Sequence, residues 1–183
     1  MIGVRLERIH FKYFDKIKEL KNDFLEHAEK RIQGSGALEK YNDLNEWFES
    51  VKNIENGKEK DIVRSTYYLI INQEEELVGT ICYRHELSEE LEEYAGQVGY
   101  SIRPSERNKG YAKEALRLLL LEHNKDVIIT CEENNIASNK VIQANNGVLL
   151  NTVIKYGLFI NRYFIKATSS CWRFKVNLVE IIY

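Results

Sequence analysis

The stretch Gly96–Ala112, GQVGYSIRPSERNKGYA, decides how this sequence is interpreted. Its pattern predicts a strand over Gln97–Arg103, a polar loop over Pro104–Lys109 and a helix that opens at Gly110. The first N–H groups of a helix have no partner within the helix and lie at the positive end of its dipole. Gly110 lets a phosphate come close to the backbone because it carries no Cβ atom. The stretch therefore predicts a pyrophosphate cradle at a strand-to-helix junction.

The motif inside this stretch is neither of the two common phosphate-binding motifs. The sequence contains no GxxxxGK[ST] and no GxGxxG. It does match [QR]-x-x-G-x-[GA], and Arg107 and Lys109 within the match add positive charge. A pattern this short also arises by chance in an ordinary helix-capping loop, so its position between a strand and a helix carries the prediction. The matching residues are Arg107, Asn108, Lys109, Gly110, Tyr111 and Ala112.

The rest of the chain predicts a mixed α/β layer architecture with the order β-α-α-β-β-β-α-β-α-β-β. Glu86–Glu93 is expected to be a solvated acidic loop, with attraction of a cationic amine as the alternative. The apolar run Val127–Cys131 suggests a strand buried on both faces, as in a parallel pair. The other expected strands are Val4–Ile9, Ser65–Asn72, Leu77–His85, Val148–Ile154 and Phe159–Lys166, and the expected helices are Tyr13–Gln33 (ended by Gly34-Ser35-Gly36), Leu44–Asn53, Gly110–His123 and Ile136–Asn145.

Composition excludes several classes of protein. The 183 residues fit one domain, and 26 basic against 28 acidic residues give a net charge of −2, which does not favour nucleic-acid binding. The sequence contains no apolar run long enough for a membrane span and no secretory signal. Cys82, Cys131 and Cys171 are widely spaced and indicate reduced thiols in the cytoplasm. No metal is expected, because no CxxC occurs and the four histidines are scattered.

Two segments together resemble a known family. GYSIRPSERNKGYAKEAL is similar to motif A of the GNAT superfamily, the acyl-CoA-dependent N-acetyltransferases. Downstream, TCEENNIASNKVIQANNG is similar to the second motif on the CoA side of that family. With RYFI, these segments resemble one bacterial branch of predicted acetyltransferases, and the resemblance extends to about Ile165. It implies a GNAT-like domain over residues 1–166, with a splayed central pair of parallel strands and acetyl-CoA as cosubstrate.

The resemblance also implies roles for individual residues. Backbone groups near Ile102 would bind the pantetheine arm and orient the thioester. Backbone N–H groups from Arg107 to Ala112 would hold the pyrophosphate. The side chain of Asn135, with Ser138, would contact the CoA arm, although Asn135 could equally cap the helix that follows it. Lys140 would come within reach of a phosphate.

The sequence departs from the family pattern at the position of the general acid. Many members carry a tyrosine where this chain has Ile142, so the proton donor to the leaving thiolate is not identified. Tyr163, Tyr156 and His85 are candidate catalytic residues, each with a structural role as the alternative. Two smaller departures are Gln97, where the branch often has histidine, and Ser88, where it often has asparagine.

The sequence therefore predicts a cytoplasmic N-acetyltransferase that transfers acetyl from acetyl-CoA to a primary amine of a small molecule or peptide by direct attack. The alternatives are a non-catalytic acyl-CoA-binding regulatory module and an interaction domain with a vestigial cleft. No nucleic-acid or membrane partner is expected. Residues 167–183 are expected to form an extension, an added strand on this subunit's sheet edge or on that of a second copy, which would make a homodimer.

Overall fold

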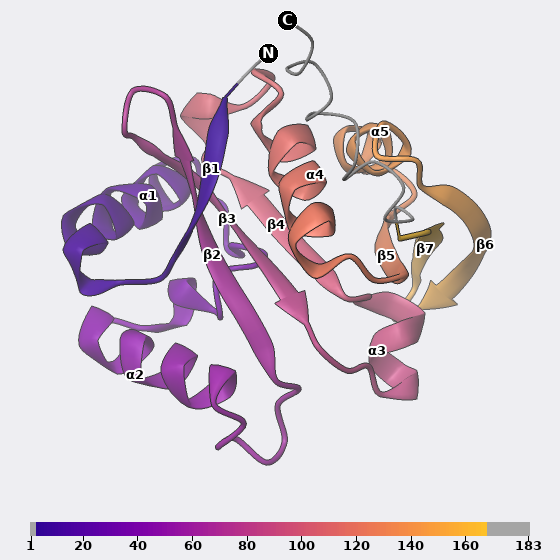
Figure 1. Cartoon of the computed structure of the whole chain (residues 1–183), viewed down its shortest axis with the longest axis horizontal. Coiled ribbons are helices and arrows are strands. Elements are labelled where there is room, and N and C mark those ends of the chain that lie inside the picture. Colours follow the sequence, from indigo (N-terminus) through magenta and orange to yellow (C-terminus); the bar gives the residue numbers. More distant parts are fainter. Residues whose placement is uncertain (1–2, 168–183) are drawn as a thin grey trace, which may run out of the picture.

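A computed structural model describes residues 3–167, apart from the side chains of residues 89 and 90. The expected C-terminal extension lies outside the described residues. The fold has a four-stranded antiparallel sheet in the order β1-β2-β3-β4 and a three-stranded antiparallel sheet in the order β5-β7-β6 (Figure 1). The strands are β1 (Val4–Arg8), β2 (Ser65–Asn72), β3 (Leu77–Arg84), β4 (Val98–Ile102), β5 (Val127–Glu132), β6 (Val148–Lys155) and β7 (Leu158–Ile165).

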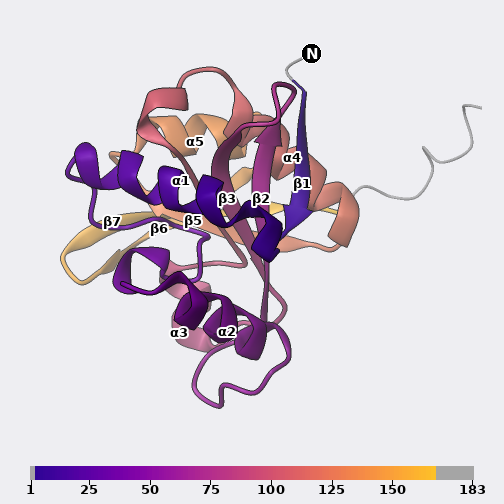
Figure 2. The ribbon, with the colours of Figure 1, turned by 90° about the vertical axis from the view of Figure 1, so that its left-hand side faces the viewer.

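Helices cover both faces of the four-stranded sheet. The helices α1 (Phe14–Glu26) and α2 (Leu44–Glu55) lie on one face, and α4 (Tyr111–His123) lies on the other (Figures 1 and 2). The short α3 (Glu89–Tyr94) precedes β4, and α5 (Ile136–Gln143) follows β5 and contacts α4. Three 3-10 turns complete the helical elements at Phe11–Tyr13, Leu38–Lys40 and Pro104–Glu106.

The strand β2 divides the hydrophobic core into two layers. Its side chains alternate between the faces of the sheet, as the two-residue period of a strand requires. Leu69 and Ile71 pack with α1 and α2, whereas Tyr68 and Ile70 pack with α4 and β5. All eight residues of β2 are buried, so this strand is the centre of the structure.

The first helix ends earlier than its apolar periodicity predicts. It stops at Glu26 rather than Gln33 because Ala28 adopts a left-handed conformation with φ of 57°. The N–H of Glu29 then bonds the carbonyl of Phe24 at 2.9 Å, which closes the helix end in the manner of a Schellman motif. The Gly34–Gly36 segment therefore belongs to a loop and does not terminate the helix, although Ile32 is still buried in the core.

Two further expectations were wrong. The acidic segment contains the helix α3 rather than only a loop, and Ser88 caps it by accepting a hydrogen bond from the N–H of Leu91. The strand β5 is not buried on both faces, because burial alternates along it. Its hydrogen-bonded neighbour is β7, which runs antiparallel to it.

Candidate active site

The strands β4 and β5 meet at their first residues and then separate. The N–H of Gln97 bonds the carbonyl of Ile128 at 2.7 Å, and the Gln97 side-chain Oε1 accepts the N–H of Ile128 at 2.5 Å. Beyond this junction the strands belong to different sheets in the part of the chain that the structure describes. The side chain of Gln97 thus makes the last bond between the two strands, and the splay implied by the resemblance opens at this point.

Within residues 3–167, β4 has a strand partner on one side only, which is β3. The N–H of Arg103 bonds Val78 on the β3 side, so the polar groups of alternate residues on β4 face the opposite side. Val98, Tyr100 and Ile102 therefore turn their N–H and C=O groups away from β3, and Tyr100 and Ile102 do so beyond the junction, toward the gap between β4 and β5. The carbonyl of Ile102 accepts a hydrogen bond from Arg107 Nε at 3.0 Å, which leaves the Tyr100 groups and the Ile102 N–H facing the gap.

The loop between β4 and α4 presents its backbone at the start of the helix. Gly110 is the N-cap residue of α4, with φ of 84° and no side-chain capping bond. Asn108 is also left-handed, with φ of 63°. The N–H groups of Tyr111 and Ala112 at the first turn therefore have no partner within the helix. The predicted cradle has the backbone geometry that an anion needs.

The two basic side chains of the predicted motif, Arg107 and Lys109, are already paired. Arg107 donates two hydrogen bonds to the Glu29 carboxylate, at 2.5 and 2.8 Å, and its guanidinium lies over the Phe24 ring. Lys109 forms an ion pair with Glu106 at 2.8 Å. The positive potential of the cradle thus comes from the helix N-terminus more than from these side chains, and Arg107 fastens the loop to the chain after α1.

A second contact fixes this loop to α1. The buried carboxylate of Asp23 accepts hydrogen bonds from Arg103 Nε, at 2.5 Å, and from the hydroxyl of Ser105. Burial favours the protonated acid, but the bonds from Ser105 and Arg103 outweigh it and hold the pKa of Asp23 below its usual value. Asp23 is therefore ionised at neutral pH and holds the start of the β4–α4 loop, at Arg103 and Ser105.

Two hydroxyl groups meet beside the gap between β4 and β5. The Tyr100 hydroxyl on β4 lies 2.7 Å from the Ser138 hydroxyl on α5, and either can donate. Burial raises the pKa of Tyr100, so its hydroxyl stays protonated at neutral pH. Cys131 at the end of β5 borders the same place, and burial raises the pKa of its thiol to about 11. The group at this point is therefore a pair of neutral proton donors.

A buried amide network shapes the turn between β5 and α5. Asn139 donates to the carbonyls of Glu132, Glu133 and Asn135. Its Oδ1 accepts the Tyr163 hydroxyl at 2.6 Å. Asn135 caps α5 by accepting the Ser138 N–H at 3.0 Å. Tyr163 is thus placed in the core, 2% exposed, as a support for this turn.

The other two candidate catalytic residues lie away from the gap. His85 belongs to an aromatic cluster with Tyr83 and His123 on the α4 side of the sheet, and its ring nitrogen bonds the Thr66 hydroxyl at 2.8 Å. Burial, assisted by nearby cations, lowers the pKa of His85. Tyr156 is 73% exposed at the tip of the β6–β7 hairpin.

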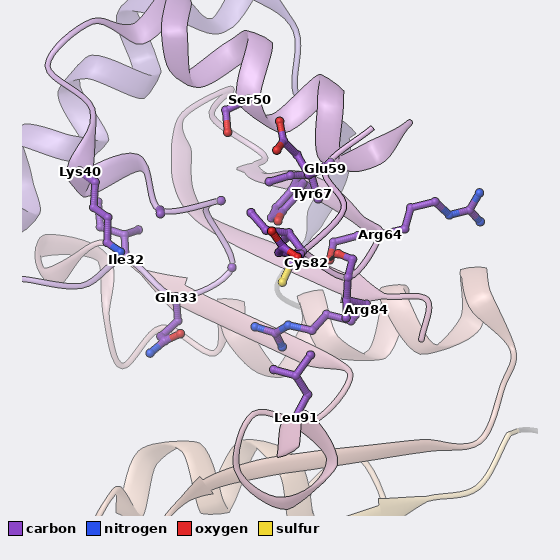
Figure 3. A pocket seen from close by; sticks show the side chains of 18 of the residues that line it. Ile32, Gln33, Lys40, Ser50, Glu59, Arg64, Tyr67, Cys82, Arg84 and Leu91 are labelled. Carbon is purple, nitrogen blue, oxygen red and sulfur yellow. Dashed lines mark hydrogen bonds between the residues drawn. The ribbon is translucent and has the colours of Figure 1, made fainter. Parts of the chain in front are cut away.

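A large cavity opens on the opposite face of the four-stranded sheet. It has a volume of about 1070 Å³ and lies between the α1–α2 loop, the α2–β2 loop, the ends of β2 and β3, and α3 (Figure 3). Gly34 forms part of its wall, directly over β4: a Cβ on Gly34 would lie 2.3 Å from the carbonyl oxygen of Gly99. Arg84 and Cys82 also border the cavity, and both lie above Gly99 on β4.

Two residues of the site, Tyr100 and Arg84, were not identified from the sequence. Tyr100 stands inside the quoted motif, but its contact with Ser138 joins positions 38 residues apart and has no local signal. Arg84 is the last residue of β3, and a charged residue at the end of a strand is too common to indicate a binding role. The alternation of side chains along β3 could have located Arg84. It places Cys82 and Arg84 on one face of the sheet, and Tyr83 and His85 on the other.

The described residues contain neither a membrane-spanning helix nor a cluster of metal ligands. No helix in residues 3–167 is both long and apolar enough to span a membrane. Over the same range, no three side chains of the His, Cys, Asp or Glu type are grouped as metal ligands. The expectation that no metal is needed stays a prediction.

Comparison with known proteins identifies the family. The family model described as an acetyltransferase (GNAT) domain matches residues 19–147. No curated protein sequence matches the chain. Among solved structures, RimL, a ribosomal-protein alpha-N-acetyltransferase in complex with coenzyme A, superimposes with a TM-score of 0.67 at 16% identity, over 90% of this chain and 94% of that one.

Two other solved structures share the fold. The microcin C7 self-immunity acetyltransferase MccE, in complex with acetyl-CoA and AMP, has a TM-score of 0.63 at 17% identity, over 89% of this chain and 92% of its own. The spermidine N-acetyltransferase of Vibrio cholerae, in complex with CoA and spermine, has a TM-score of 0.58 at 12% identity, over 88% of this chain and 94% of its own. The family model covers more than two thirds of the chain, and this protein therefore belongs to the GNAT family of acetyl-CoA-dependent acetyltransferases.

Proposed function

We propose that this enzyme transfers an acetyl group from acetyl-CoA to a primary amine by direct attack of the amine on the thioester. The observation that carries the proposal is the junction at Gln97 and Ile128, from which β4 and β5 separate beside the uncapped N-terminus of α4. These two features together offer a slot for an extended arm and an anion site at one end of it. RimL, MccE and the spermidine enzyme support the choice of donor, because each was solved with CoA or acetyl-CoA.

The residues present fit the donor. The backbone N–H groups from Asn108 to Ala112 would hold the pyrophosphate, with Gly110 allowing close approach, whereas the Arg107 N–H already bonds the Pro104 carbonyl at 3.4 Å. The outward-facing backbone groups of Tyr100 and Ile102 would bind the pantetheine amides. Asn135 and Ser138 would border the arm from the α5 side. When bound, acetyl-CoA supplies the thioester that the amine attacks.

The chain's own groups then favour the reaction in two ways. A backbone N–H on the open edge of β4, at Tyr100 or Ile102, would stabilise the negative charge that develops on the thioester oxygen. The hydroxyls of Tyr100 and Ser138 would supply a proton to the departing thiolate. A thiol has a pKa of about 8.5, so it is a good leaving group and needs only a weak acid. The acceptor amine, mostly protonated at neutral pH, would lose its proton to water in the open cavity.

The alternative is a non-catalytic acyl-CoA-binding module. The observation in its favour is Ile142, which replaces the family's tyrosine and is fully buried in the core. Against it stands the hydroxyl pair of Tyr100 and Ser138, which supplies proton donors from another element. Turnover of acetyl-CoA with an amine acceptor separates the two functions.

Location and assembly are further parts of the proposal. A cytoplasmic location is expected from the wide spacing of Cys82, Cys131 and Cys171 in the sequence. The strand β6 lies at a sheet edge with exposed apolar side chains, including Val148, Leu150 and Ile154. A homodimer through this edge is a prediction that light scattering can test.

The experiment that tests donor binding is titration of CoA into Gly110→Val, followed by calorimetry. The added side chain should block close approach of the pyrophosphate and reduce CoA affinity by about tenfold or more. The matched control is Gly157→Val, which introduces the same side chain at a similar positive φ of 77° in open space on the β6–β7 turn. Equal CoA affinity in the two variants would contradict the proposed cradle.

A further inference from the structure

The lining of the large cavity carries more positive than negative charge. Six basic and four acidic side chains border it, and none of the ten forms an ion pair within residues 3–167. Charged groups that remain unpaired around a cavity are available to a ligand. The basic residues are Lys30, Arg31, Lys40, Lys60, Arg64 and Arg84, and the acidic ones are Glu39, Glu59, Asp61 and Glu86.

Burial singles out Arg84 from this group. The other five basic residues are exposed, whereas Arg84 is half-buried. In Figure 3, Arg64 points away from the cavity, while the Arg84 guanidinium points across it toward Gln33. A Cβ on Gly99 would lie 3.7 Å from Arg84 Nη2, so the guanidinium sits above the strand β4. Arg84 therefore marks the inner end of the cavity, nearest the splayed strands.

The hydrogen bonds of Arg84 leave part of its guanidinium open. Nη1 donates to the carbonyls of Ala95 and Gly96, at 3.3 and 3.0 Å, which fixes the side chain in place. Nε and Nη2 have no hydrogen-bond partner among the described residues, yet neither is sealed from solvent. A guanidinium held by one nitrogen and open at two others has the geometry to bind a carboxylate or a phosphate.

The acidic residues do not neutralise this position. Glu39, the one half-buried acid of the lining, faces the backbone N–H of Ile32 at 3.4 Å. Glu59, Asp61 and Glu86 are exposed. The acidic segment around α3 is also partly neutralised, because Glu92 pairs with Arg162 and Glu93 with Lys155. The inner end of the cavity is thus cationic, which disfavours a polyamine acceptor.

We propose that the acceptor is a primary amine that also carries an anionic group, a carboxylate or a phosphate, and that Arg84 binds this group. The inference rests on the proposed acetyl transfer and specifies its substrate class. The cavity volume of about 1070 Å³ is enough for a short peptide or a molecule of nucleotide size. Anchoring the anion at Arg84 places the acceptor on the face of β4 opposite the hydroxyl of Tyr100.

The first test compares acceptors that differ only in charge. The peptide amides Ala-Asp-Ala and Ala-Asn-Ala have the same terminal amine and nearly the same shape, and Ala-Lys-Ala carries the opposite charge. Ala-phosphoserine-Ala against Ala-Ser-Ala distinguishes phosphate from carboxylate as the preferred anion. The expected kcat/KM is about tenfold or more higher for the anionic member of at least one pair, the scale of a charge-assisted hydrogen bond. Equal or better use of the neutral peptides, the lysine peptide or spermidine would overturn the inference.

A binding measurement keeps this result separate from the proposed function. The N-acetylated forms of the same peptides are titrated into the protein by calorimetry, so that no turnover is required. Tighter binding of the anionic form supports the inference even if no peptide is acetylated, and equal binding overturns it. Absence of turnover with every amine, despite CoA binding, would instead contradict the proposed acetyl transfer.

The second test assigns the preference to Arg84. Arg84→Gln should reduce the ratio of kcat/KM between the anionic and neutral peptides to near one, and Arg84→Lys should keep most of it. The matched control is Arg117→Gln, the same substitution on the exposed side of α4, where Arg117 pairs with Glu114. A ratio that is unchanged in Arg84→Gln, or reduced equally in Arg117→Gln, would overturn the role of Arg84, whereas a purely structural role would lower both rates together.

Discussion

Replacing Gly34 by alanine should destabilise the protein much more than the same change at Gly157. Both glycines have positive φ, 78° and 77°, which an alanine adopts at a cost of roughly 1–2 kcal/mol. They differ in their surroundings. A Cβ on Gly157 meets no atom within 4 Å, whereas a Cβ on Gly34 would lie 2.3 Å from the carbonyl oxygen of Gly99 and 3.1 Å from the Cα of Ile81.

The contact at Gly34 sets the expected magnitude. Real Cβ atoms essentially never approach another atom closer than 3.0 Å, and both neighbours here are backbone atoms of the central sheet. The loop must therefore move away from β4, and overpacking of this kind costs about 1–3 kcal/mol in well-packed interiors. Gly34→Ala should thus lose about 2–5 kcal/mol, against about 1–2 kcal/mol for Gly157→Ala.

Urea unfolding of both variants and the parent measures this difference. The same displacement should raise the KM of the acceptor, because the loop forms one wall of the cavity above Gly99. If Gly34→Ala and Gly157→Ala are destabilised to the same extent, the α1–α2 loop does not lie on β4, and the description of the cavity fails with it.

Three other changes test the site. Asp23→Asn should lower the free energy of unfolding by about 2 kcal/mol, because Arg103 loses its charged partner. Since folding lowers the pKa of Asp23, the parent keeps this stability above about pH 4 and loses it on acidification, and the urea midpoints of the two proteins should therefore converge at low pH. Tyr100→Phe should lower kcat about tenfold or more while CoA affinity measured by calorimetry stays unchanged, and an unchanged kcat would exclude its hydroxyl as proton donor. Dialysis against EDTA should leave turnover unaffected, and a loss restored by a divalent ion would contradict metal-free catalysis.

The elements that follow strong periodicity could be predicted from the sequence. Ser65–Asn72 was predicted to the residue, because a run of β-branched and aromatic side chains bounded by polar residues has one interpretation. The helix α4 and the β6–β7 hairpin around Tyr156-Gly157 were within a residue or so of their observed bounds. Local patterns also located the loop before α4, where Gly110 proves to have a positive φ of 84°.

Unusual local backbone conformations and contacts between distant residues could not be predicted. The helix α1 ends at a left-handed Ala28. Alanine seldom adopts this conformation, and no residue pattern around position 28 predicts it. Arg107 was expected to add charge to the anion site, but Glu29, 78 residues away, binds its guanidinium. Arg84 acquires its importance only from the fold, which places it above Gly99 at the inner end of the cavity.

The central claim is that the gap between β4 and β5 holds acetyl-CoA for attack by an amine. The most direct test incubates the purified chain with acetyl-CoA and an amine panel that includes the charge-matched peptides, with mass detection of acetylated product and of free CoA. The account predicts equal amounts of acetylated amine and CoA, both strongly reduced in Gly110→Val but not in Gly157→Val. No acetylated product from any amine, while calorimetry shows that CoA binds, would contradict it.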